Sequence, residues 1–76
     1  MREEVERFAE AMEEKLKDND WKSGWGGCSD LYILEKIYHK LDIISHNLVE
    51  DIPTEDACVD LGNYVMMLFD NIKNRH

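Results

Sequence analysis

The strongest constraint on this chain comes from residues 55–73, "EDACVDLGNYVMMLFDNIK", which predict a helix that is apolar around most of its circumference. Its main stripe places apolar residues three or four positions apart, the spacing of one helix face. Val59, Met66, Met67 and Phe69 extend the apolar character to the other faces. Such a helix must be buried on most sides. Because a chain of 76 residues has few elements to cover it, we expect a second subunit to supply part of the cover.

Two further helices are predicted, at about 2–18 and 30–49, each with an apolar stripe of helical spacing. The glycine-rich stretch "WKSGWGGCS" separates these two helices, and Pro53 in "VEDIPTED" separates 30–49 from 55–73. Ser29 and Thr54 are the expected N-caps. No strand pattern is present. We therefore predict a single all-α domain in which 30–49 and 55–73 form an antiparallel hairpin, and two such hairpins pair into a four-helix bundle by dimerisation, or assemble further into a tetramer.

Charge and cysteine content restrict the partners and the compartment. The net charge is −8, whereas nucleic-acid polymers and anionic membranes attract clustered Lys and Arg. No segment is apolar enough for a membrane span, and the charged start "MREEVERFAE" is unlike a signal peptide. Cys28 and Cys58 lack the spacing of a metal or redox motif. We expect both to be reduced thiols in a cytoplasmic protein, and a Cys28–Cys58 disulfide is the less favoured alternative.

Asp60 and Asn63 lie one turn apart in the middle of the helix that should be most buried. A carboxylate that faces the interior of a bundle is costly unless it is paired or bound to a metal. Asp60 therefore either sits at the edge of an interface, near a lysine or water, or belongs to a functional site.

The surrounding sequence resembles a known family. The run from Ala57 to Met67, "ACVDLGNYVMM", is similar to the second metal-binding helix of the MazG-like all-α nucleoside triphosphate pyrophosphohydrolases, which reads roughly Glu-Cys-Ala-Asp-Val-Ala-Asn-Phe-Ala-Met-Met. The upstream "KLKDNDWKSGW" and "LYILEKI" resemble the same group. The resemblance is specific from Asp60 to Met67 and diffuse elsewhere.

That resemblance implies a chemistry. In the family, Glu-Glu-x-x-Glu on one helix and Glu-x-x-Asp on another present four carboxylates across a cleft. They hold Mg²⁺, which grips a nucleoside triphosphate and activates the water that releases pyrophosphate. Here the corresponding stretches are "HKLDI" and "ACVD". Of the four main ligand positions, three have become Lys40, Ile43 and Ala57, and Asp60 remains as a remnant.

The replacements suggest a direct substitute for the metal. We expect Lys40 to reach across to Asp60 as an ion pair, with Ile43 packed against Ala57 beside it. Other groups are weaker metal candidates: Glu35, His39, Asp42 and Asp56. His39 with Asp42 or His46 would suit a transition metal, but i, i+4 pairs on a solvated flank explain the same spacing.

Other positions have both a functional and a structural interpretation. Asn63, Lys22 and Trp25 are candidates for substrate binding, with Trp25 or Trp21 stacking on a base and Lys22 near phosphate. The alternative is that the tryptophans cover a small core. Gly62 is unfavourable in a helix and predicts the close approach of another helix.

Two classes of function are compatible with these observations. The first is a Mg²⁺-dependent nucleotide pyrophosphohydrolase, weakened or rebuilt from the remaining acids. The second is a non-catalytic oligomeric bundle that binds a nucleotide or another protein. The resemblance favours the first class, and the missing ligands favour the second.

Overall fold

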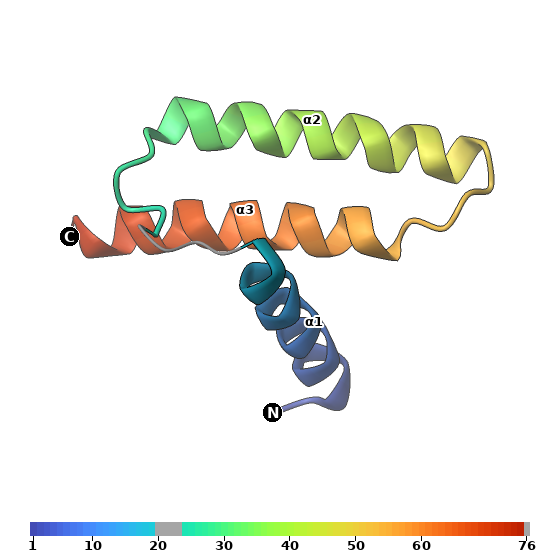
Figure 1. Cartoon of the computed structure of the whole chain (residues 1–76), viewed down its shortest axis with the longest axis horizontal. Helices are drawn as coiled ribbons and strands as arrows, with labels where there is room; N and C mark the ends of the chain where they lie inside the picture. The colour runs from blue at the N-terminus through green and yellow to red at the C-terminus, as the bar shows by residue number, and fades with distance from the viewer. Residues whose placement is uncertain (20–23, 76) are drawn as a thin grey trace.

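The computed structural model describes residues 1–19 and 24–75, which form three α-helices and no strand (Figure 1). The helices are α1 (Glu3–Asn19), α2 (Asp30–Val49) and α3 (Glu55–Asn74), within a residue of the predicted bounds. The all-α prediction is confirmed. Helices α2 and α3 lie side by side and antiparallel, as the short connection between them predicted.

The helix ends differ in how their caps work. Ser29 caps α2 as predicted, because its Oγ accepts a hydrogen bond from the Tyr32 backbone N–H at 3.1 Å. Thr54 occupies the N-cap position of α3, but its hydroxyl donates to the Ile52 carbonyl at 2.7 Å instead. The expected side-chain cap at Thr54 is therefore wrong. The backbone of Thr54, at φ −123° and ψ −5°, is not the extended conformation that directs a capping side chain at the helix N–H groups.

The connection after α2 is closed by a Schellman motif. The Ile52 N–H donates to the Asn47 carbonyl at 2.9 Å, and the Asp51 N–H donates to the Leu48 carbonyl at 3.4 Å. These are the two bonds of the motif, which requires a left-handed residue at the position of Asp51. Asp51 adopts that conformation with φ 56°. The motif reverses the chain tightly enough for α3 to return along α2.

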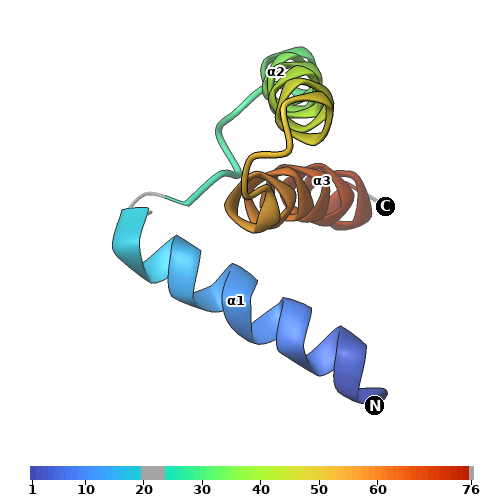
Figure 2. The same ribbon diagram turned by 90° about the vertical axis from the view of Figure 1, so that its right-hand side faces the viewer.

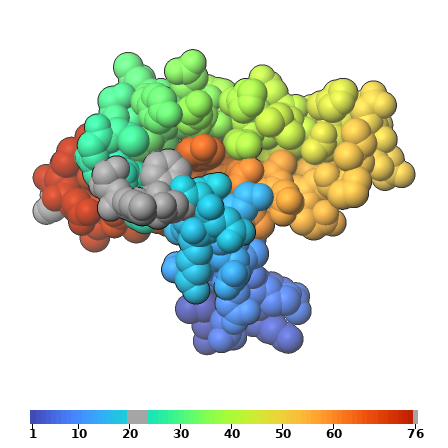
Figure 3. Space-filling view, viewed as in Figure 1, coloured from blue at the N-terminus to red at the C-terminus, as the bar shows by residue number. Residues whose placement is uncertain are grey.

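Helix α1 crosses α3 on a different side from α2, projects away from the hairpin and has no buried residue (Figures 2 and 3). In the described part of the chain it packs against α3 alone. The crossing is close at Gly62, where an added Cβ would lie 2.5 Å from Phe8 Cζ. The prediction that Gly62 marks the close approach of another helix is confirmed.

The core of the single chain is small. Ile33, Ala57 and Met67 are its buried apolar side chains, and Asn63 and Asn71 are buried beside them. In contrast, Val65 and Phe69 of α3 remain 48% and 67% exposed. Within one chain, α3 is therefore covered on fewer sides than its sequence requires.

One side of the α2–α3 hairpin carries an uncovered apolar surface, which we call the hairpin face. In each helix its residues lie about a quarter turn from those that pack between α2 and α3, and Leu61 and Val65 at its edge also border the space between α3 and α1. It consists of Leu34, Tyr38, Leu41 and Leu48 of α2 and Leu61, Val65, Leu68 and Ile72 of α3. Five of these are between 41% and 67% exposed.

Candidate functional site

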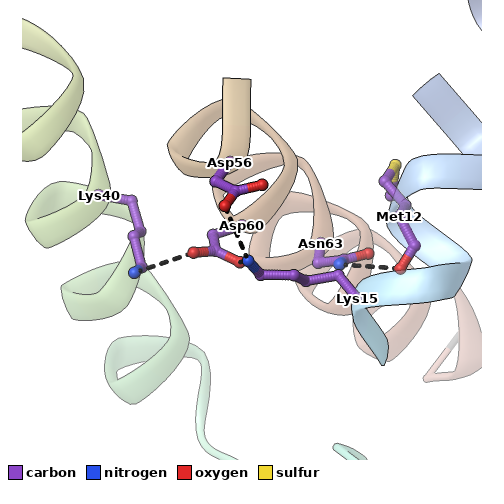
Figure 4. Close-up of polar contacts among 6 residues, drawn as sticks. All are labelled: Met12, Lys15, Lys40, Asp56, Asp60 and Asn63. Carbon is purple, nitrogen blue, oxygen red and sulfur yellow. Dashed lines mark hydrogen bonds and ion pairs between the residues drawn. The ribbon is translucent and has the colours of Figure 1, made fainter. Parts of the chain in front are cut away.

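Asp60 lies where all three helices meet (Figure 4). It comes from the second turn of α3, between α2 and α1, with 19% of its side chain exposed. Asp56 lies one turn earlier and Asn63 one turn later, so the three polar side chains follow one side of the helix. This arrangement places a carboxylate in a partly dry position that needs cationic partners.

Lys40 of α2 supplies the first partner. Its Nζ lies 3.1 Å from Asp60 Oδ2, and only 24% of the lysine side chain is exposed. This is the ion pair between Lys40 and Asp60 that was predicted from the sequence. Partial burial of both groups makes it stronger than a typical surface pair, because less water screens the two charges.

Lys15 of α1 supplies a second partner that the sequence reasoning missed. Its Nζ lies 3.8 Å from Asp60 Oδ1 and 3.7 Å from Asp56 Oδ2 (Figure 4). Two ammonium groups and two carboxylates thus form a neutral cluster. The sequence does contain a signal for this contact. Lys15 immediately precedes Leu16, the last residue of the apolar stripe of α1, and so lies at the edge of the face that packs.

Asn63 joins α3 to α1 by a hydrogen bond. It is 4% exposed, and its Nδ2 donates to the Met12 carbonyl at 3.1 Å. Its Oδ1 is buried and accepts no hydrogen bond from the described residues. The amide N–H of Asn63 is therefore committed to the α1–α3 contact, and substrate binding through Asn63 stays a prediction.

Ile43 and Ala57, the two apolar residues predicted to pack beside Asp60, differ in burial. Ala57 is 7% exposed and belongs to the core, whereas Ile43 is half-buried on α2. Their predicted mutual contact stays a prediction. The side chain of Ala57 is a methyl group and provides no oxygen that could bind a metal ion.

The weaker metal candidates point into solvent. Asp56 is 93% exposed at its side chain, and Glu35, His39, Asp42 and His46 are exposed along α2. Among residues 1–19 and 24–75, no three His, Cys, Asp or Glu side chains form a group that could hold a metal ion. Cys28 and Cys58 are free thiols, half-buried and exposed respectively.

Trp25 is attached to the far part of α3. Its Nε1 donates to Asp70 Oδ2 at 3.0 Å, and its carbonyl accepts from Asn71 Nδ2 at 3.1 Å. Asp70 lies ten residues beyond Asp60, which is about 15 Å along a helix. Trp25 therefore does not join the Asp60 cluster and instead fixes the glycine-rich loop to α3. Trp21 and Lys22 lie outside the described residues.

Comparison with known proteins adds no relative. No family model, no curated protein sequence and no solved structure matches the chain. None of the helices in the described part combines the length and the apolar character that a membrane crossing requires.

Proposed function

We propose that this chain is a MazG-like helical protein in which an ion pair has replaced the metal site, and that it acts as a non-catalytic homodimeric bundle. The observation that carries the proposal is the 3.1 Å contact between Lys40 Nζ and Asp60 Oδ2. The resemblance assigns both residues to metal-ligand positions. A lysine there gives Asp60 a permanent cationic partner from the chain itself.

The charges of the cluster support loss of the metal. A Mg²⁺ ion at Asp60 would meet the ammonium groups of Lys40 and Lys15, which lie 3.1 and 3.8 Å from its oxygens. At about 4 Å and an effective dielectric constant of about 20, each ammonium would repel the ion by roughly 8 kcal/mol unless it moved away. On the same basis, the attraction of the ion to one carboxylate at about 2 Å is roughly 16 kcal/mol, which only balances the two ammonium groups and leaves nothing to offset the loss of water from Mg²⁺.

The hairpin face supports self-association. With about 200 Å² for a large side chain, the exposed fractions of its five most exposed residues correspond to roughly 500 Å² per subunit. Two copies would remove about 1,000 Å² from water, the smallest area expected of a specific interface. Pairing through this face would produce the predicted four-helix bundle and cover the exposed side of α3. Two free thiols agree with a cytoplasmic location in this proposal.

A weak Mg²⁺-dependent pyrophosphohydrolase is the second candidate. It is favoured by the approach of Asp56 and Asp60 to one atom, Lys15 Nζ, within 3.8 Å. Mg²⁺ is often bound by one or two carboxylates together with substrate phosphates and water. If Lys15 moved away, these two acids would provide that minimum when a nucleoside triphosphate is bound.

Pyrophosphate release separates the two candidates. The assay uses a panel of NTPs and dNTPs at high protein concentration, with Mg²⁺ or Mn²⁺, and compares the native chain with Asp60→Asn. We expect no release above the variant. Metal-dependent release that disappears in Asp60→Asn would replace the non-catalytic proposal with the weak enzyme. Sedimentation of the same samples tests the homodimer separately.

A further inference from the structure

An apolar groove lies between α1 and α3, distinct from the Asp60 cluster. It has a volume of about 660 Å³, and its lining includes Phe8, Met12, Gly62, Val65, Met66 and Phe69. The N-terminal end of α1 points away from α3, so the two helices diverge (Figure 1). Phe8 and Phe69 are 42% and 67% exposed, which leaves large aromatic surfaces in contact with water.

The groove continues into an acidic end. A second hollow of about 350 Å³ shares Phe8 and Cys58 with the groove, and Glu4, Arg7 and Glu55 border it. Arg7 is already engaged, because its Nη1 lies 3.6 Å from Glu3 Oε1. Glu4 and Glu55 are exposed and have no ion pair within the described residues. An apolar channel thus ends beside two unneutralised carboxylates.

The apolar lining of the groove favours a helical partner segment over an extended one. The backbone groups of α1 and α3 are bonded within their own helices, so the groove offers few hydrogen-bond partners to an incoming chain. An extended peptide would leave its N–H and C=O groups unsatisfied there, whereas a helix satisfies its own. The floor from Cys58 to Phe69 spans about 16 Å, or three helical turns. An amphipathic helix docked by its apolar face therefore matches the groove.

The charge around the groove indicates which charged residues the docked helix should carry. Each of the three helices of this chain carries more Asp and Glu than Lys and Arg, so a second copy would bring further carboxylates toward Glu4 and Glu55. We propose that the groove between α1 and α3 binds an amphipathic helix of a basic partner protein, with Lys or Arg side chains against Glu4 and Glu55. Leu61 and Val65 line both the groove and the hairpin face, so a hairpin-face dimer would cover one edge of the groove, whereas the inference does not depend on catalysis.

Two synthetic peptides of four to five helical turns test the proposal. One has Leu on one face and Lys on the other, and the second replaces every Lys with Glu. Anisotropy of the labelled peptides measures binding, and the alkylation rate of Cys58 in a Cys28→Ser variant reports whether the groove is covered. We expect the Leu/Lys peptide to bind at least tenfold more tightly than the Leu/Glu peptide and to slow alkylation of Cys58 at least tenfold.

Variants distinguish groove binding from general attraction to an acidic protein. Phe69→Ser should weaken binding of the Leu/Lys peptide at least tenfold, and Glu4→Gln with Glu55→Gln several-fold. Glu10→Gln with Glu14→Gln removes the same charge from the side of α1 away from Phe8 and Met12, and should leave binding unchanged. Equal weakening by both charge pairs, or no effect of Phe69→Ser, would overturn the proposal. So would Cys58 protection that depends on protein concentration and not on peptide, because a second copy would then occupy the groove.

Discussion

Lys40 and Asp60 join α2 to α3 through a 3.1 Å contact between Nζ and Oδ2, with 24% and 19% of their side chains exposed. Lys15 approaches the other carboxylate oxygen from α1 at 3.8 Å. One carboxylate thus bridges cations from both neighbouring helices. The cluster links the three helices in the way that a shared metal ion links its ligands.

Removing Lys40 should destabilise the fold. Lys40→Met leaves the half-buried Asp60 with only the longer contact to Lys15, and we expect a loss of about 1–2 kcal/mol in the free energy of unfolding. Urea unfolding of Lys40→Met, Asp60→Asn and the double variant gives the coupling energy, which should be about 1 kcal/mol. A coupling energy near zero would mean that the pair contributes nothing to stability.

Introducing the carboxylates that the family resemblance implies should create a metal site. Lys40→Glu, Ile43→Glu and Ala57→Glu together with Asp60 rebuild the ligand set implied by the family resemblance. Without metal, we expect repulsion to lower the Tm of this triple variant. Millimolar Mn²⁺ should raise its Tm, because an ion that binds only the folded state stabilises it.

The native chain, titrated with Mn²⁺ in parallel, should show no change in Tm. Adding Asp60→Asn to the triple variant is the matched control and should reduce the response to metal. Stabilisation of the native chain to the same extent would contradict the view that lysines have displaced the ion.

The effects of substitutions at Gly62 and Phe8 on the free energy of unfolding should be strongly coupled. An alanine Cβ at Gly62 would lie 2.5 Å from Phe8 Cζ, so Gly62→Ala must displace the ring into solvent. We expect a net cost of about 0.5–1 kcal/mol, because the higher helix propensity of alanine offsets part of the lost packing. In a Phe8→Ala background the same substitution should stabilise by about 1 kcal/mol. Thermal unfolding of the four variants tests this reversal of sign.

Asp51 offers a stabilising substitution. Its φ of 56° is unfavourable for a residue with a Cβ and suits glycine at the C′ position of the Schellman motif. We expect Asp51→Gly to stabilise the chain by about 0.5–1 kcal/mol, whereas Asp51→Val should destabilise it. Urea unfolding measures both effects. Destabilisation by glycine would argue against the left-handed conformation at this residue.

Charge on the hairpin face should prevent the proposed dimer. Leu41 is 49% exposed near the middle of the face, and Leu41→Glu would bury a carboxylate twice across a two-fold interface. We expect the dissociation constant to rise at least 100-fold, about 2.7 kcal/mol. Analytical ultracentrifugation measures it, with His46→Glu on the exposed flank of α2 as the control. Equal weakening by both substitutions would place the interface elsewhere.

The sequence by itself determined the three helices, their ends to within a residue, the cap at Ser29 and the close approach at Gly62. These features depend on local periodicity, turn residues and backbone freedom, which are visible within a few positions. The pairing of Lys40 with Asp60 could also be predicted, because family resemblance placed the two positions across from each other. The cap bond at Thr54 could not, since it depends on the exact backbone angles at the turn.

Only the tertiary structure decided which side of α3 receives α1. That crossing brings Lys15 to Asp56 and Asp60, commits the Asn63 amide to Met12, and opens the groove beside Phe69. The tertiary structure likewise decides that Trp25 contacts Asp70 and not Asp60. Helical periodicity identifies the face of α1 that packs but not the angle or position at which it packs. Those depend on how the side chains of two helices fit together, and contacts between residues 45 to 51 positions apart follow from that fit alone.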